Sequence, residues 1–346
     1  MSTSVPQLRV PLAGRRSGRL TRAARAPLAR FIGRRLLMVI PVLWGVSFFT
    51  FVAMNALPGS AAQSLLGPNA TPQEVARFEA QLGLDQPFFE RYWDWLTGVL
   101  HGDLGTSLAS GASVSSILLD ALPVTAELIL VAIVVALLVA IPLALLAARR
   151  PNGIADRAGL FLSMVGLSIA NYVLALVLVY IFAVKLRWLP AMGWTTPGED
   201  LGQNLRCLVL PAVSIGLPLL CFYTRLLRAD LLEQMQGEDY VVTARAKGAG
   251  PWRVLVHHAL RNSTFGLITI VALNLGTLLG GAVIVEQIFQ IPGVGRAMLS
   301  AIDNRDIPVV TGAVLVFAVI VVLANLVADI LYSVLDPRIR YGDART

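Results

Sequence analysis

Six long apolar blocks divide this chain, and they constrain its fold more than any other feature. They run over residues 36–57, 124–148, 158–184, 208–224, 265–285 and 309–335. A helix needs about 20 mostly apolar residues to cross the hydrocarbon core of a bilayer. The chain is 56% apolar and 14% charged, whereas soluble domains carry about 25% charged residues. These features predict an all-α membrane protein with six transmembrane helices.

Two of the blocks need separate comment. The fourth is short and contains Pro211 and Pro218, so we expect an irregular helix there. The first is longer than the core of a signal peptide, and the segment from Ala53 to Ala56 is a poor cleavage site. We therefore expect the first block to remain as an uncleaved membrane span.

The distribution of Lys and Arg predicts the orientation. With the N-terminus inside, 21 of the 28 Lys and Arg residues fall on the inner side, and cytoplasmic loops carry such an excess. Both termini are then cytoplasmic, with an outer loop over residues 58–123 and an inner loop over 225–264. The basic arm 1–35 is expected to lie on anionic lipid. Nucleic-acid binding is disfavoured because the arm precedes a membrane span and has no aromatic residue before Phe31. Residues 336–346 form a cytoplasmic tail.

The outer loop holds one clear helix signal, "TPQEVARFEAQLGL". Thr71 fits the N-cap, Pro72 the first helical position and Glu74 the third, which together make a capping box. Gly83 is expected to stop this helix.

The inner loop reads as a helical hairpin below the membrane. A helix leaving the fourth block ends at Gly237, and "EDYVVTARAKG" forms a short helix with Ala244 and Gly248 on one face. "GAGP" must turn, and "PWRVLVHHALRN" restarts the helix with Pro251 in its first turn. Small residues at this spacing let another protein approach closely. The alternative is an amphipathic helix that rests on lipid.

Polar residues inside the apolar blocks are candidates for a transport pathway. Asn171 and Asn274 either contact substrate or form helix–helix hydrogen bonds, which are worth about 0.6–2 kcal/mol. Asn325 and Asp329 are four residues apart and share a helix face. Asp329 is expected to pair with a cytoplasmic arginine.

Two glutamates, Glu127 and Glu286, lie near outer helix ends, where structural and gating roles are both open. Cys207 and Cys221 are interpreted as packing residues. The three histidines, His101, His257 and His258, are interpreted as ordinary polar residues. We predict no catalytic and no metal-binding residues.

No phosphate-loop signature G-x-x-x-x-G-K-[ST] occurs in the sequence. The chain has two lysines, Lys185 and Lys247, and neither lies in such a loop. The chain is therefore not expected to bind ATP by that route or to act as an enzyme.

A series of motifs from Phe31 to Gly342 resembles the permease subunits of ABC transporters, in the dipeptide/oligopeptide family and in its B-type half. In chain order the motifs are "LPGSAA", "LGLDQPFFERYWDWL", "GDLGTS", "LPVTAELIL", "TARAKG", "HALRN", "GGAVIVEQIFQIPGVG" and "NLVADILYSVLDPRIRY". Two positions depart from the family pattern. Val242 stands where the signature of the inner loop has glutamate, and Gly266 stands where the family often has proline.

The resemblance implies the type I ABC importer permease fold over residues 36–335, in the inner membrane of a bacterium. It implies a second homologous permease, two ATPase subunits that bind ATP and Mg, and an extracytoplasmic peptide-binding protein. The chain itself is expected to bind no cofactor. We expect the outer loop 58–123 to dock the binding protein.

In this family the inner loop docks on the ATPase. That role would fall on Ala244, Arg245, Ala246, Lys247, Gly248, Pro251 and Trp252. A structural or gating role would fall on Pro292 and Gly293, as well as on Asn325 and Asp329. Glu286 is a further candidate for the translocation pathway, together with Asn171 and Asn274.

Other functions remain open at this stage. The same fold could import glutathione, a nickel chelate or haem. An ion-coupled secondary transporter would also have membrane spans and buried carboxylates, but no repeated halves are evident. A membrane enzyme finds no support in a nucleophile–base pair or a metal cluster.

Overall fold

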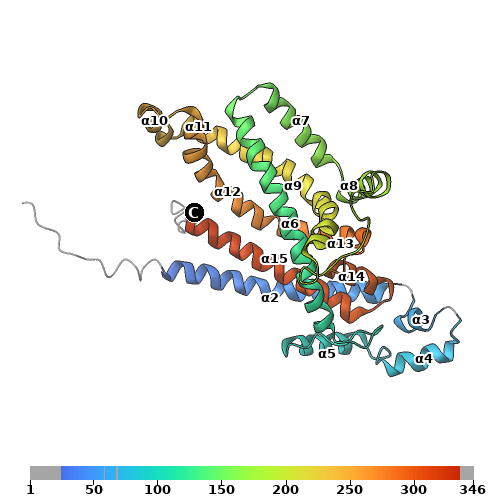
Figure 1. Ribbon diagram of the computed structural model, residues 1–346. Coiled ribbons are helices and arrows are strands. Elements are labelled where there is room, and N and C mark those ends of the chain that lie inside the picture. The colour runs from blue at the N-terminus through green and yellow to red at the C-terminus, as the bar shows by residue number, and fades with distance from the viewer. Residues whose placement is uncertain (1–24, 58, 68, 336–346) are drawn as a thin grey trace, which may run out of the picture.

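The computed structural model describes residues 25–57, 59–67 and 69–335, and the long regular elements in this part are helices (Figure 1). The remainder of the basic arm and the tail 336–346 lie outside the described residues. The helices are α2 (Arg25–Ala56), α3 (Ala61–Leu66), α4 (Pro72–Gln81), α5 (Phe88–Leu100), α6 (Val114–Arg149), α7 (Ile154–Ser168), α8 (Asn171–Leu178), α9 (Leu201–Gly237), α10 (Asp239–Ala246), α11 (Pro251–Val254), α12 (Leu260–Leu273), α13 (Leu275–Phe289), α14 (Val294–Asp303) and α15 (Ile307–Leu335). Two π-helical turns, Val179–Lys185 and Leu255–Ala259, continue α8 and α11.

Four helices are long and apolar enough to span a membrane on their own. They are Leu37–Ala56 in α2, all of α6, Leu201–Gln236 in α9 and Ile307–Ile330 in α15. Two bent pairs raise the number to six if each pair is one span. The six predicted blocks therefore all map to helical spans.

The third and fifth blocks are not the continuous helices that we expected. The third bends by 99° between α7 and α8, and the fifth bends by 51° between α12 and α13. Asn171 begins α8 and Asn274 separates α12 from α13. Asparagine is a weak helix former because its side chain competes for backbone hydrogen bonds, so a break next to each asparagine has a local cause.

The expectation of an irregular fourth helix is wrong. α9 runs without interruption from Leu201 to Gly237 and contains both Pro211 and Pro218. Membrane helices tolerate proline when neighbouring groups satisfy the freed backbone. The predicted extension to Gly237 is confirmed.

α6 and α9 form the most extensive helix pair of the structure. The face of α6 toward this contact carries alanines four residues apart, namely Ala132, Ala136, Ala140, Ala144 and Ala148, all buried. Residues at this spacing lie on one side of a helix. Small side chains let the two backbones approach closely, which is how membrane helices gain packing energy.

A close approach of the two backbones in this pair occurs at Gly216 of α9. A methyl group at this position would lie 3.0 Å from the carbonyl oxygen of Ala132. The contact is with backbone, which cannot rotate away as a side chain can.

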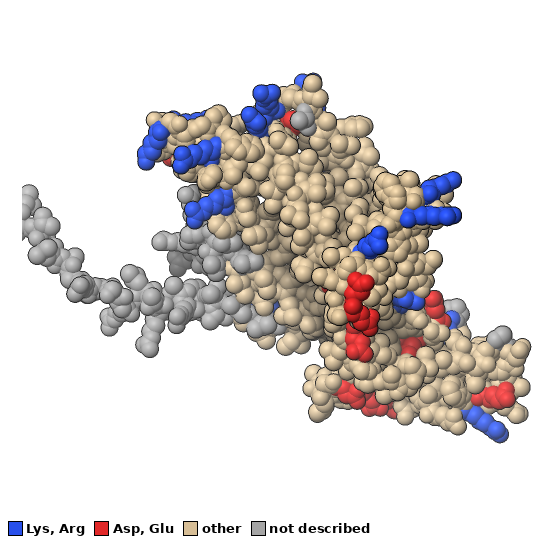
Figure 2. All heavy atoms as spheres, in the orientation of Figure 1, with Lys and Arg blue, Asp and Glu red and all other residues tan. Residues whose placement is uncertain are grey.

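The two ends of the molecule differ in charge. Figure 2 shows Lys and Arg gathered over α10, α11 and the junction of α6 with α7, whereas Asp and Glu prevail toward α5 at the opposite end. This separation agrees with the orientation predicted from the sequence.

The predicted outer helix is confirmed as α4. The Thr71 amide donates to Glu74 Oε2 at 2.8 Å, and the Glu74 amide donates to Thr71 Oγ1 at 3.4 Å. The Thr71 amide and the Thr71 hydroxyl both donate to the Glu74 carboxylate, and these two hydrogen bonds lower the pKa of that carboxyl. Gly83 has φ +67° just beyond the helix, as expected for a stop signal.

We expect Gly216→Ala to destabilise the protein and Gly266→Ala to leave it unchanged or more stable. Overpacking costs about 1–3 kcal/mol, whereas alanine gains about 0.5–1 kcal/mol over glycine in a helix. Gly266 is the matched control because nothing lies within 4 Å of a methyl group there. Thermal unfolding of the purified variants in detergent measures both. Equal unfolding temperatures would contradict this account of the α6–α9 contact.

Candidate functional site

The inner loop folds as the predicted hairpin. α9 ends at Gly237, α10 covers Asp239–Ala246, and α11 begins at Pro251 and continues through the π-helical turn into α12. We call residues Asp239–Ala259 the inner hairpin. It lies at one end of the molecule, where α10 and α11 project beyond the long helices (Figure 1).

The turn of the hairpin is a Schellman motif. The Gly248 amide donates to the carbonyl oxygen of Arg245 at 2.9 Å, and the Ala249 amide donates to that of Ala244 at 3.1 Å. Gly248 has φ +82°, a left-handed conformation that glycine adopts without the steric cost of a Cβ. Pro251 then opens the next helix at its first position, where its missing N–H is not needed. The turn is therefore fixed by its own hydrogen bonds.

The hairpin has a small core of its own, formed by Val241, Ala244 and Val254. We expected Ala244 to present a small side chain to another protein, but it is only 9% exposed and packs inside the hairpin. Because the Ala244 side chain is small, α10 can pack closely against α11. The other predicted coupling residues, Arg245, Ala246, Lys247, Gly248, Pro251 and Trp252, are exposed.

Several contacts hold the hairpin to the long helices. The Arg149 guanidinium, at the end of α6, lies 5.7 Å from the ring centre of Trp252. Arg245 donates to the carbonyl oxygen of Met235 at 3.3 Å, and the Tyr240 hydroxyl donates to Gln234 at 2.5 Å. These contacts join the hairpin to α9 and to the end of α6.

A buried ion pair that the sequence analysis missed lies close to the basic end of the molecule, where the inner hairpin also lies. Asp156 is 1% exposed, and Arg228 of α9 donates to it through both Nε and Nη2, the latter at 2.7 Å. The Asn152 amide adds a third hydrogen bond at 2.9 Å. The pair fastens the α6–α7 connection to α9. The sequence hint was an aspartate just before the third apolar block and an arginine just after the fourth.

The two asparagines proposed for the pathway both contact neighbouring helices. Asn274 donates to the Tyr223 hydroxyl of α9 at 3.4 Å. The Asn171 amide nitrogen lies against Gly281 of α13, where it would be 2.9 Å from an added methyl group. Both side chains are half-buried. These contacts favour helix–helix bonding, and a role in substrate contact stays a prediction.

Glu286 is fully buried, in a position that favours a structural role over substrate contact. Its carboxylate accepts from the Thr125 hydroxyl at 2.7 Å and from the Arg296 amide at 3.1 Å. The amide of Val294 donates to the same threonine at 2.9 Å. A carboxyl group at the start of α14 can accept from the free N–H groups of that helix.

The residues around Glu286 explain two of the glycines. A methyl group on Gly293 would lie 2.4 Å from the Glu286 oxygens, and one on Gly295 would lie 2.5 Å from Val283 Cα. Pro292 is exposed beside them. Glycine is thus required for α14 to approach α13, and a gating role for Pro292 and Gly293 stays a prediction.

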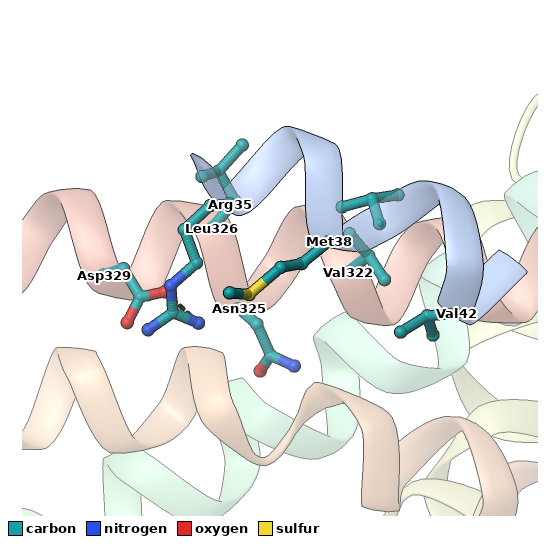
Figure 3. A pocket seen from close by; sticks show the side chains of 8 residues that line it. Arg35, Met38, Val42, Val322, Asn325, Leu326 and Asp329 are labelled. Atoms are coloured by element: carbon teal, nitrogen blue, oxygen red, sulfur yellow. Dashed lines mark ion pairs between the residues drawn. The ribbon is translucent and has the colours of Figure 1, made fainter. Parts of the chain in front are cut away.

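Asp329 has an arginine partner, as expected. Arg35 Nη1 of α2 lies 2.9 Å from Asp329 Oδ2 of α15, and Figure 3 shows the two side chains turned toward each other. A cavity of about 150 Å³ lies beside this ion pair, between α2 and α15, and Asn325 is one of its lining residues. The ion pair joins the N-terminal half of α2 to the C-terminal part of α15.

Comparison with known proteins identifies the family. The profile described as "Binding-protein-dependent transport system inner membrane component" matches residues 140–341, and the profile of its N-terminal part matches residues 28–129. The chain belongs to this family. It is therefore a multi-pass inner membrane component of a binding-protein-dependent transport system, with the permease fold, and ATP is hydrolysed by separate subunits. Membership of this family favours the ABC permease interpretation over the secondary-transporter and membrane-enzyme interpretations.

Three relatives illustrate the similarity. The probable peptide ABC transporter permease protein y4tP of Sinorhizobium fredii is 36% identical, over 90% of this chain and 99% of its own length. The oligopeptide transport system permease protein AppB of Bacillus subtilis is 38% identical, over 91% and 100%. The glutathione transport system permease protein GsiC of Salmonella typhi is 36% identical, over 91% and 100%.

We expect Asp156→Leu to destabilise the protein by about 3–5 kcal/mol, because it leaves the Arg228 charge buried without its partner. The double variant Asp156→Leu/Arg228→Met removes both charges and should recover most of this loss. Asp329→Asn is the control, since its partner Arg35 is 48% exposed and exposed pairs contribute about 0–1 kcal/mol. Unfolding temperatures in detergent test all three. A double variant no more stable than Asp156→Leu would contradict the ion-pair account.

Proposed function

We propose that this chain is one permease half of an ATP-driven peptide importer and that its inner hairpin docks on the ATPase. A second homologous permease would complete the pathway, and two ATPase subunits would bind ATP and Mg. The observation that carries the proposal is the inner hairpin itself. It projects at the basic end of the molecule, its turn is fixed by a Schellman motif, and six of the seven predicted coupling residues are exposed.

The proposed mechanism is alternating access. ATP binding would bring the two ATPase subunits together and draw the docked hairpins with them. Because α9 is continuous from Leu201 to Gly237, it would carry this movement through the membrane as a rigid body. The outward-open state would receive peptide from the binding protein, and hydrolysis would restore the inward-open state. Each ligand acts by favouring one of the two states.

The remaining parts of the chain fit this scheme. The outer loop 58–123 is proposed to dock the binding protein, and the arm 1–35 and the tail 336–346 to lie on the cytoplasmic side. The arm would contact anionic lipid, and no role in nucleic-acid binding is proposed. Asn171 and Asn274, at the two helix breaks, are retained as candidates for contact with peptide.

Peptide is the proposed substrate because two of the three relatives described above are named for peptides or oligopeptides. Glutathione is the second candidate, on the strength of GsiC. It is itself a small peptide, so the two substrates share backbone amides and terminal charges. In proteoliposomes with the native binding protein, we expect uptake of a labelled dipeptide or oligopeptide that excess glutathione reduces weakly. Uptake of glutathione alone would reverse this order.

Variants at Gly248 test the docking role of the inner hairpin. The complex is purified through a tag on this chain, reconstituted in lipid, and assayed for ATPase activity with and without the binding protein. We expect Gly248→Glu to reduce the stimulated rate at least tenfold, since it strains the turn and places bulk on the docking face. Gly248→Asn, which tolerates positive φ, should reduce it less.

Gly193→Glu is the matched control. Gly193 also has a positive φ, +106°, and nothing lies within 4 Å of an added methyl group, but it lies outside the inner hairpin. We expect the Gly193→Glu variant to keep the stimulated ATPase rate. A chain that purifies without an ATPase and still transports substrate down an ion gradient would overturn the proposed function.

A further inference from the structure

The inner hairpin contains a cavity of about 500 Å³ beside its turn. It is lined by side chains from α10, the turn, α11 and the π-helical turn, including Tyr240, Thr243, Lys247, Gly248, Arg253 and His258. Its volume exceeds that of a single side chain, so it can accept a short segment of another molecule.

The charges around this cavity are of one sign. Lys247 and Arg253 are cationic, His258 is the third ionisable nitrogen group, and no carboxylate is among the lining residues. Within the described part of the chain, neither Lys247 nor Arg253 has a carboxylate within 4.0 Å; the ion pairs found there are Arg35–Asp329 and Asp156–Arg228. Two acidic residues, Glu238 just before the hairpin and Asp239 at its start, stand at the other end of α10. The cavity is therefore suited to an anion.

We propose that this cavity receives a carboxylate-bearing segment of the ATPase. The proposal rests on the docking function above and adds the chemistry of the contact: an acidic side chain of the partner pairs with Lys247 and Arg253. Charge-assisted hydrogen bonds of this kind are shorter and stronger than neutral ones. Complementary charges also select the correct partner.

The position of the cavity favours protein over lipid as the source of the anion. The fifth apolar block begins at residue 265, and the helix leading to it begins at Pro251. Fourteen helical residues separate these points, or about 21 Å at 1.5 Å per residue. On the other side, α9 continues 13 residues beyond the fourth block, which is about 20 Å. The headgroup layer is only about 5–8 Å thick, so stalks of this length favour a position of the cavity beyond that layer.

The scarcity of lysine makes the contact testable by cross-linking. The chain has two lysines, and the other, Lys185, ends the π-helical turn that continues α8. A water-soluble carbodiimide activates a carboxylate, and an amine then displaces the resulting urea to form an amide. A cross-link from the inner hairpin is thus assignable to Lys247 Nζ by mass spectrometry of the purified complex.

We expect wild-type complex to give an amide between Lys247 and an Asp or Glu of the ATPase. Lys247→Arg keeps the charge and removes the amine, so the ATPase should still co-purify while the cross-link disappears. Lys247→Glu/Arg253→Glu should lower binding-protein-stimulated ATPase activity at least tenfold and release the ATPase at lower salt. Arg261→Glu is the control, because Arg261 is exposed and outside the cavity.

The same samples distinguish the alternatives. The complex is compared in nanodiscs of phosphatidylcholine alone and with phosphatidylglycerol, which has no carboxylate. Stimulation that requires phosphatidylglycerol, without a cross-link to the ATPase, would assign the cavity to lipid and overturn the proposal. The proposal is also overturned if Lys247→Glu/Arg253→Glu leaves the stimulated ATPase activity unchanged and no cross-link to the ATPase forms. If Gly248→Glu still abolishes stimulation in that case, the docking function stands and only the acidic contact fails.

Discussion

The close contact between α6 and α9 is the interaction on which the rest of the structure depends. A stripe of alanines on α6 faces α9, and Gly216 brings the two backbones together near Ala132. Within a membrane, where lipid chains are as apolar as side chains, such packing rather than hydrophobic burial holds helices together. α9 remains one helix despite its two prolines, and it is the element that carries the inner hairpin.

Buried carboxylates fasten the connections around this pair. Asp156 binds Arg228 and the Asn152 amide at the basic end. At the other end Glu286 accepts from Thr125 and from the start of α14. Asp306 accepts from the Ser107 hydroxyl at 2.5 Å and from the Leu108 amide at 3.1 Å. A buried charge is costly unless it is paired or hydrogen-bonded. Asp156 thus fixes the α6–α7 connection against α9, Glu286 joins α13 to α6 and to the start of α14, and Asp306 joins the start of α15 to the loop before α6.

The sequence predicted features that depend on local chemistry. The capping box of Thr71 and Glu74, the end of α9 at Gly237 and the turn at Gly248 each follow from the preferences of a few neighbouring residues, and each is present. It could not predict that Ala244 packs inside the hairpin, because that depends on where Val254 lies in space. The Asp156–Arg228 pair escaped for the same reason, since 72 residues separate its members. Hydropathy could not reveal the helix breaks at Asn171 and Asn274, because it records the length of an apolar segment and not whether its helix is continuous.

The hairpin combines a rigid turn with unpaired cations, and the two properties depend on each other in the proposed docking. A flexible loop would lose conformational entropy on binding, at about 1–2 kcal/mol for each residue that becomes fixed. The Schellman motif and the core of Val241, Ala244 and Val254 have already fixed this backbone in the free chain. Lys247 and Arg253 are consequently held beside one cavity before any partner arrives. More of the electrostatic attraction then remains as binding energy, and a partner without a carboxylate at the matching position gains none of it.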